Sequence, residues 1–86
     1  MKHLTFAQSA WDDYIFWQLN DKKTLRKINE LLKDIQRTPF DGIGLPEPLK
    51  GSKSWSRRIN NADRLVYEVS NDAIIILQCK GHYDDK

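Results

Sequence analysis

Pro46-Glu47-Pro48 is the first of three short stretches whose side chains could do chemistry. Two prolines with fixed φ angles restrict where the carboxylate of Glu47 can point. A general base needs such a fixed direction, whereas a surface acid does not. An exposed acid on a rigid loop would have the same sequence, so the motif alone leaves both interpretations open.

The second stretch holds three arginines, Arg57, Arg58 and Arg64. Adjacent strand residues point to opposite faces, so Arg57 and Arg58 cannot face the same ligand. One of these two is expected to cover the helix side or to pair with an acid, whereas Arg58 and Arg64 share a face if the hairpin between them is symmetrical. A guanidinium can bond two phosphate oxygens at once. Salt bridges to Asp63 or Glu68 explain the arginines equally well.

The third stretch is His82-Tyr83, whose imidazole can donate and accept a proton near neutral pH. Together the three stretches fit RNA cleavage without a metal. Glu47 would remove the proton of a ribose 2′-hydroxyl, and His82 would protonate the departing 5′-oxygen. Arg64 with Lys50 would neutralise the phosphate, and Tyr83 could stack on a base. A frayed chain end is the alternative interpretation of His82-Tyr83. The combination is by itself a loose signal, because many small proteins contain one Glu, one Arg and one His.

Helical and extended patterns surround these stretches. Residues 2–6 alternate weakly and predict a short strand. Ser9, three residues before Asp12, indicates a capping box at the start of a helix that stops near Asn20. Asp21 then caps a second helix, which Thr38 ends because a proline follows it. Two helices joined so closely form an antiparallel hairpin.

The second helix combines an apolar stripe with a basic surface. Its apolar residues recur at helical spacing and are Leu25, Ile28, Leu31, Leu32 and Ile35. Residues 21–58 hold ten Lys or Arg against five acids. This surplus indicates an acidic partner, such as nucleic acid or an acidic protein segment, or only a solvated helix face.

Glycine and proline are concentrated in residues 40–54, which predicts a long loop, and a long loop in so compact a domain is more often functional than a short one. Alternating strands follow over residues 55–59, 64–69 and 73–79, separated by turns. Short turns imply an antiparallel meander, with the apolar last strand inside the sheet and the helix hairpin on one face. The predicted fold class is α+β, a small single domain over residues 1–86.

Composition supports one globular domain of 86 residues, with 40% hydrophobic and 30% charged residues. The longest apolar run, residues 73–77, is far shorter than the ~20 residues that cross a bilayer, and no signal-peptide pattern begins the chain. The single Cys79 and two histidines make no metal-ligand spacing. We therefore expect a reduced, cytoplasmic domain without a metal or another cofactor.

Seven blocks in the same order resemble the YoeB/Txe family of bacterial toxins, in the RelE superfamily. They are Trp11-Asp12-Asp13-Tyr14, Lys27-Ile28-Asn29-Glu30-Leu31, Arg37-Thr38-Pro39-Phe40, Pro46-Glu47-Pro48-Leu49-Lys50, Trp55-Ser56-Arg57-Arg58-Ile59, Arg64-Leu65-Val66-Tyr67 and His82-Tyr83. The resemblance implies a RelE-like fold and a ribosome-dependent endonuclease that cleaves translated mRNA in the ribosomal A site. It also implies neutralisation by a YefM-type antitoxin, a homodimer, and binding of operator DNA mainly through the antitoxin complex.

The resemblance also implies a role for each site residue. Glu47 matches the proposed general base of the family, and His82 matches the general acid. Arg64 matches the arginine that stabilises the transition state, and Tyr83 lies beside the acid. The remaining matches are basic residues of the same cleft, expected to bind RNA, and they are Lys50, Arg57 and Arg58.

Three departures from the family pattern motivate an alternative. Only four residues separate Lys50 from Trp55, and Asp63 could draw Arg64 away from phosphate. Residues 84–86 add two negative charges beside the expected cleft. The alternative is a module of the same fold that occupies the decoding site, or grips an antitoxin or nucleic acid, without cleaving. A DNA-binding domain is less consistent with the chain, which lacks a helix-turn-helix signature.

Overall fold

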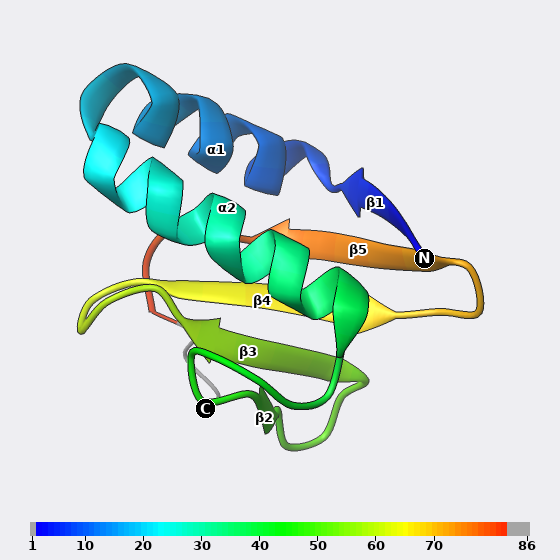
Figure 1. Cartoon of the computed structure of the whole chain (residues 1–86). Helices are drawn as coiled ribbons and strands as arrows, with labels where there is room; N and C mark the ends of the chain where they lie inside the picture. The colour runs from blue at the N-terminus through cyan, green and yellow to red at the C-terminus, as the bar shows by residue number, and fades with distance from the viewer. Residues whose placement is uncertain (1, 83–86) are drawn as a thin grey trace.

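A computed structural model describes residues 2–82, in which two helices cover one side of a five-stranded sheet (Figure 1). The elements follow in the order β1 (His3–Phe6), α1 (Gln8–Asn20), α2 (Lys22–Arg37), β2 (Glu47–Pro48), β3 (Ser54–Arg58), β4 (Arg64–Val69) and β5 (Ala73–Gln78). The predicted α+β class and the helix hairpin are thereby confirmed.

The strands lie in the order β1-β5-β4-β3-β2. Strands β3, β4 and β5 form the predicted antiparallel meander, and β5 is an interior strand between β1 and β4. β1 pairs parallel with β5, so the sheet is mixed. This parallel pair needs a long connection, and the two helices together with β2, β3 and β4 supply it.

The two helices begin differently. Asp21 caps α2 as predicted, because its carboxylate accepts hydrogen bonds from the N–H of Thr24 at 3.1 Å and from the Thr24 hydroxyl at 2.7 Å. The hydrogen bond from the Thr24 hydroxyl is the main reason that the pKa of Asp21 is lowered. The predicted cap of α1 is wrong, because Ala7 occupies the N-cap position and Ser9 lies inside the helix. The Ser9 hydroxyl instead donates to the carbonyl oxygen of Leu77 at 3.2 Å.

The hydrophobic core lies between the helices and the sheet face that they cover, which we call the inner face. Ile28, Leu31 and Ile35 of α2 are fully buried, as the predicted stripe requires. They are clustered with residues of α1 and of the inner face, namely Ala10, Trp17, Leu65, Tyr67, Ile74 and Ile76. Burying each large apolar side chain stabilises the fold by about 1.5–3 kcal/mol.

A β-bulge interrupts the pairing of β4 with β5. Tyr67 pairs with Ile76, but the next residue back, Val66, pairs with Gln78, so Leu77 is an extra residue in β5. Strict alternation would place Gln78 on the inner face with Ile74 and Ile76. The bulge turns Gln78 to the opposite face, which we call the outer face.

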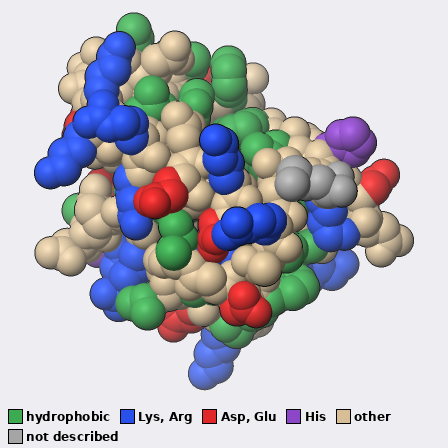
Figure 2. Space-filling view, in the orientation of Figure 1, with side chains coloured by type: hydrophobic (Ala, Val, Ile, Leu, Met, Phe, Trp, Pro, Cys, Tyr) green, Lys and Arg blue, Asp and Glu red, His purple; other side chains and the backbone are tan. Residues whose placement is uncertain are grey.

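Lysine and arginine side chains gather over the N-terminal part of α2, at the upper left of the molecular face shown in Figure 2. Lys22, Lys23 and Arg26 are exposed there, so the basic surplus of the sequence includes a solvated helix surface. Between residues 2 and 82, none of the helices has both the length and the apolar character that crossing a membrane requires.

Candidate functional site

One row of residues crosses the outer face through four strands. Directly opposite residues of neighbouring strands point to the same face. The row consists of Glu47 on β2, Ser56 on β3, Val66 on β4 and Gln78 on β5. Arg58 and Arg64 form the next pair in the same orientation, two residues along β3 and β4. The hairpin register therefore confirms that these two arginines share a face.

Glu47 occupies an exposed position on β2, a strand that the sequence pattern missed. Its carboxylate is exposed and has no hydrogen bond or ion pair with any residue between 2 and 82. The predicted loop over residues 40–54 is wrong in this part, because Glu47 and Pro48 pair with β3. The hairpin turn that follows is closed by the N–H of Leu49, which donates to the carbonyl oxygen of Ser54 at 2.8 Å.

Lys50 lies in that turn, and its side chain is exposed. It follows β2, whereas Arg58 ends β3 at the opposite end of the same hairpin. Glu47 pairs with the middle residue of β3 and therefore lies between these two cations. The backbone thus places Lys50 and Arg58 at opposite ends of the hairpin that carries Glu47.

Arg57 corrects an expectation, because its side chain is fully buried and cannot contact RNA. Its guanidinium forms an ion pair with the Asp34 carboxylate of α2, and its Nε donates to the Tyr67 hydroxyl at 3.2 Å. It also donates to three carbonyl oxygens of the segment after α2, which belong to Thr38 (2.7 Å), Asp41 (2.9 Å) and Ile43 (3.0 Å). The other interpretation from sequence, that one of the paired arginines meets an acid on the helix side, is confirmed.

These contacts form what we call the Arg57 clamp, made of Arg57, Asp34 and Tyr67. The Asp34 carboxylate accepts from the N–H of Ile43 at 3.0 Å, and the Tyr67 hydroxyl donates to the Pro39 carbonyl at 2.7 Å. The hydrogen bond from Arg57 is the main reason that the pKa of Asp34 is lowered, although burial opposes the shift. The clamp fixes the loop that runs directly into Pro46-Glu47-Pro48.

Arg64 is half-buried, and its Nη1 donates to the carbonyl oxygens of Asn60 at 2.7 Å and Asp63 at 3.1 Å. The sequence allowed salt bridges from the arginines of β3 and β4 to Asp63 or Glu68 as an alternative, and neither salt bridge forms among residues 2–82. The Asp63 carboxylate accepts instead from the N–H of Gly81 at 2.7 Å, and Glu68 accepts from the Ser54 hydroxyl at 3.4 Å. Bonds to neutral carbonyls orient the guanidinium of Arg64, which has no acidic partner among residues 2–82.

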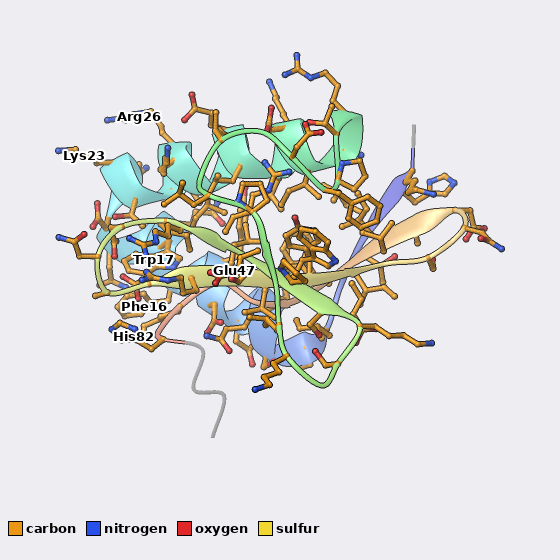
Figure 3. The ribbon with its side chains drawn as sticks, turned by 90° about the horizontal axis from the view of Figure 1, so that it is seen from below. Phe16, Trp17, Lys23, Arg26, Glu47 and His82 are labelled. Carbon is orange, nitrogen blue, oxygen red and sulfur yellow. The ribbon has the colours of Figure 1, made fainter. Side chains whose placement is uncertain are left out.

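His82 is exposed and lies on the side of the strands away from α2, at the end of the molecule where Phe16 and Trp17 also lie (Figure 3). Its segment joins the start of β4, because the N–H of Arg64 donates to the carbonyl oxygen of Gly81 at 2.9 Å. Arg58, Arg64 and the His82 segment therefore gather at one end of the outer face. Tyr83 and residues 84–86 are outside the described part of the chain.

Glu47 lies on a different strand of the outer face, at a distance from the His82 segment. It is separated from Gln78 by three strand spacings of about 4.8 Å, or roughly 14 Å between Cα atoms. Glu47 and the cluster of Arg58, Arg64 and His82 therefore flank the small residues Ser56 and Val66. The arrangement provides a carboxylate on one side, and two arginines and the segment of His82 on the other.

Comparison with solved structures first identifies the class of protein that has this fold. A chain of the Escherichia coli DinJ-YafQ complex superposes with a TM-score of 0.70 over 95% of this chain and 94% of its own, at 15% identity. That likeness shows the fold alone. A YoeB/ParE toxin from Agrobacterium tumefaciens superposes with a TM-score of 0.90 at 47% identity, covering 96% of this chain and all of the toxin.

Sequence comparison narrows the class to one family. The sequence profile of YoeB-like toxins of bacterial type II toxin-antitoxin systems matches residues 6–83. Toxin YoeB of Escherichia coli K12 is 52% identical over 82 residues, which are 93% of this chain and 98% of that toxin. The YoeB dimer from Staphylococcus aureus has a TM-score of 0.90 at 49% identity over 95% of this chain and 98% of its own. The chain belongs to the YoeB-like toxin family.

Proposed function

We propose that this protein is an endoribonuclease, an mRNA interferase that cleaves translated mRNA in the ribosomal A site and so inhibits translation. The observation that carries the proposal is the outer face, to which three neighbouring strands contribute Glu47, Arg58 and Arg64. The segment of His82 is hydrogen-bonded to the start of β4, at Arg64. Membership of the YoeB-like toxin family supports the same activity.

The chemistry is acid–base attack of the ribose on its own phosphodiester. Glu47 takes the proton of the 2′-hydroxyl, and the resulting oxygen bonds to the adjacent phosphorus. Arg64 stabilises the negative charge that builds on the phosphate oxygens. His82 donates a proton to the departing 5′-oxygen, so the products are a 2′,3′-cyclic phosphate and a free 5′-hydroxyl. In the proposal, Arg58 and Lys50 hold the RNA backbone, and Tyr83 acts beside His82.

The ribosome supplies what this small domain lacks. The base and the acid are on opposite sides of the outer face, and they act together only on an RNA bent into the space between them. Holding reactants in a productive geometry supplies a large part of catalysis, and the decoding site already holds mRNA in a fixed shape. The proposed partners are therefore the 70S ribosome and its mRNA, which implies a cytoplasmic location.

Protein partners follow from the relatives. A YoeB-YefM toxin-antitoxin heterotetramer from Staphylococcus aureus contains a chain that superposes with a TM-score of 0.87 at 49% identity, over 96% of this chain. We propose that a YefM-type antitoxin neutralises this protein, that the free protein is a homodimer, and that operator DNA binds only through the antitoxin complex. Co-expression with the adjacent open reading frame, followed by size-exclusion chromatography, tests the first two points.

The cleavage proposal is tested by primer extension on mRNA in a translating extract. Glu47→Ala and His82→Gln should each reduce cleavage by about 100-fold or more, the usual contribution of a general base or acid. Glu30→Ala and His3→Gln are matched controls, because both residues are exposed and lie outside the outer-face site. These controls should cleave like the wild-type protein, and equal losses in all four variants would contradict the assignment.

Two further results would separate the alternatives. Equal cleavage of naked RNA would contradict the requirement for the ribosome. The non-cleaving alternative predicts that Glu47→Ala and His82→Gln still inhibit growth, whereas Arg58→Ala and Arg64→Ala do not. Growth inhibition that tracks the cleavage fragments would exclude that alternative.

A further inference from the structure

Side chains of other elements hold the chain after β5 in place. The N–H of Cys79 donates to the Asp13 carboxylate at 3.1 Å, and the Trp17 Nε1 donates to the Cys79 carbonyl oxygen at 2.8 Å. Lys80 places its ammonium 4.6 Å from the ring centroid of Phe16. Segments near a chain end are poorly ordered unless they are tied down. Here α1 ties down both residues that directly follow β5.

A second anchor acts on Gly81, the residue immediately before His82. The Asp63 carboxylate accepts from the N–H of Gly81 at 2.7 Å, and the carbonyl oxygen of Gly81 accepts from the N–H of Arg64 at 2.9 Å. Gln78 donates through its amide to the carbonyl oxygens of Gly81 at 3.1 Å and His82 at 3.2 Å. Both peptide groups of Gly81 are therefore held from outside the segment.

The conformation of Gly81 explains why an anchor is needed. Its φ is +86°, in the left-handed region, and a Cβ built there would have no atom within 4 Å. Glycine is thus required by the backbone turn rather than by lack of space. A glycine without steric restraint loses much conformational freedom on folding, so hydrogen bonds at this point decide the direction in which His82 leaves the sheet.

Asp63 itself is fixed by the turn between β3 and β4. The Asn60 side-chain oxygen accepts from the N–H groups of Ala62 and Asp63, both at 2.7 Å. The N–H of Ile59 donates to the carbonyl oxygen of Asp63 at 3.0 Å. The guanidinium of Arg64 binds the same turn. One rigid turn therefore carries Arg64 and also holds the segment of His82 through Asp63.

We propose that Asp63 is a positioning residue for the proposed general acid, holding the peptide before His82 so that imidazole and Arg64 guanidinium reach the same phosphate. The inference rests on the proposed nuclease function. It reverses the expectation from sequence that an acid before Arg64 would weaken the site. The carboxylate of Asp63 is directed to the N–H of Gly81, and its own carbonyl oxygen helps to orient the guanidinium.

Three substitutions separate geometry from charge. Asp63→Asn keeps an oxygen acceptor at the same distance from the backbone but removes the charge. Asp63→Glu keeps the charge but lengthens the side chain, and Asp63→Ala removes the acceptor. Asp72→Ala is the matched control, since Asp72 is an exposed acid in the other turn of the meander. Unfolding midpoints are measured first, so that rates are compared for folded protein.

A positioning role of Asp63 predicts a specific order of cleavage rates among these variants, measured as single-turnover cleavage on programmed ribosomes. Asp63→Ala and Asp63→Glu should lower the maximal rate by up to about 100-fold, as small misplacements of a catalytic group do, while the toxin concentration giving half that rate stays unchanged. Asp63→Asn and Asp72→Ala should stay close to the wild-type rate. Full activity of Asp63→Ala, or rescue by Glu rather than by Asn, would overturn the proposal.

Amide hydrogen exchange provides a readout independent of cleavage. The N–H of Gly81 should exchange slowly in the wild-type protein and at least about tenfold faster in Asp63→Ala, because a hydrogen bond to a charged acceptor is lost. Unchanged exchange would refute the anchor even if activity falls. A wild-type protein that fails to cleave translated mRNA would refute the proposed function instead, and Gly81 exchange would still test the anchor.

Discussion

Replacing Arg57 by methionine distinguishes the two roles considered for this guanidinium. The sequence predicts that Arg57 binds RNA, whereas the structure makes it the centre of a clamp on the loop before Glu47. Methionine fills much of the same volume without a charge or a donor. Arg57→Met therefore leaves the Asp34 carboxylate buried without its main partner and leaves three loop carbonyl groups without their donor.

The magnitude follows from burial. Removing one partner of a buried ion pair costs about 3–5 kcal/mol of the free energy of unfolding. Asp34 keeps hydrogen bonds from Ile43 and from Arg37, but the Arg37 side chain is 71% exposed and its charge is screened by solvent. We therefore expect a loss of about 3–4 kcal/mol. A domain of 86 residues has a total stability of only about 4–13 kcal/mol, so the loss is a large fraction of it.

Equilibrium urea unfolding, followed by tryptophan fluorescence, measures this loss as a shift of the midpoint at constant slope. Arg58→Met is the matched control, because it removes the same charge from the neighbouring exposed position, and it should change stability by less than about 0.5 kcal/mol. Equal midpoints for the two variants would refute the clamp. An Arg57→Met protein that is fully stable but inactive would restore direct RNA contact as the explanation.

Three further outcomes are expected. The pKa of Asp34 is lowered mainly by the hydrogen bond from Arg57, so the ionised carboxylate stabilises the fold fully above about pH 5, and this stabilisation is lost as pH falls through the lowered pKa. Urea titrations should therefore give a difference in unfolding free energy between the wild-type protein and Asp34→Asn that is constant from neutral pH to about pH 5. This difference should become smaller below about pH 4. A difference that becomes smaller as pH rises would contradict the stabilising role of the ionised carboxylate. Gly42→Ala should lower the thermal midpoint more than Gly51→Ala. Both glycines have positive φ, but of the two only Gly42 would place a Cβ against another residue, the Asp34 carboxylate. Equal shifts would contradict this packing. Burial raises the pKa of the Cys79 thiol to about 12, so DTNB should label it only after unfolding, and rapid labelling of the folded protein would show that it is not enclosed.

Periodicity and end signals predicted the large elements of the fold. The apolar stripe of α2, its cap at Asp21 and the three strands of the meander all depend on contacts within one element or one short turn. The parallel pairing of β1 depends on β5, some seventy residues away in the chain. The strand β2 has two residues and no period of its own, so it exists only because β3 offers an edge. Neither the parallel pairing of β1 nor the existence of β2 could be predicted from the local sequence pattern.

The sequence proposes which residues make up the candidate site, but it does not predict the contacts that hold them in place. Alternation showed that Arg57 and Arg58 face opposite ways, but it could not show which one is buried, because that depends on Asp34 and on loop carbonyl groups far away in sequence. The hydrogen bond that the Asp63 carboxylate accepts from Gly81 was missed for the same reason, since the two residues are 18 positions apart in sequence. The position of Asp63 directly before Arg64 indicated a contact of its carboxylate, but the sequence suggested Arg64 as the partner, whereas the structure shows the N–H of Gly81.

The register of β3 links the stability of the fold to the proposed chemistry. Arg57 and Arg58 are adjacent, and one of them is fully buried in the clamp while the other is exposed on the outer face. A slip of β3 by one residue would exchange them, placing the wrong guanidinium in the core and turning Ser56 away from the face that carries Val66. The Arg57 clamp resists such a slip, because a buried arginine needs all of its fixed acceptors at once. The clamp therefore fixes the orientation of the outer face as well as the loop that carries the proposed base.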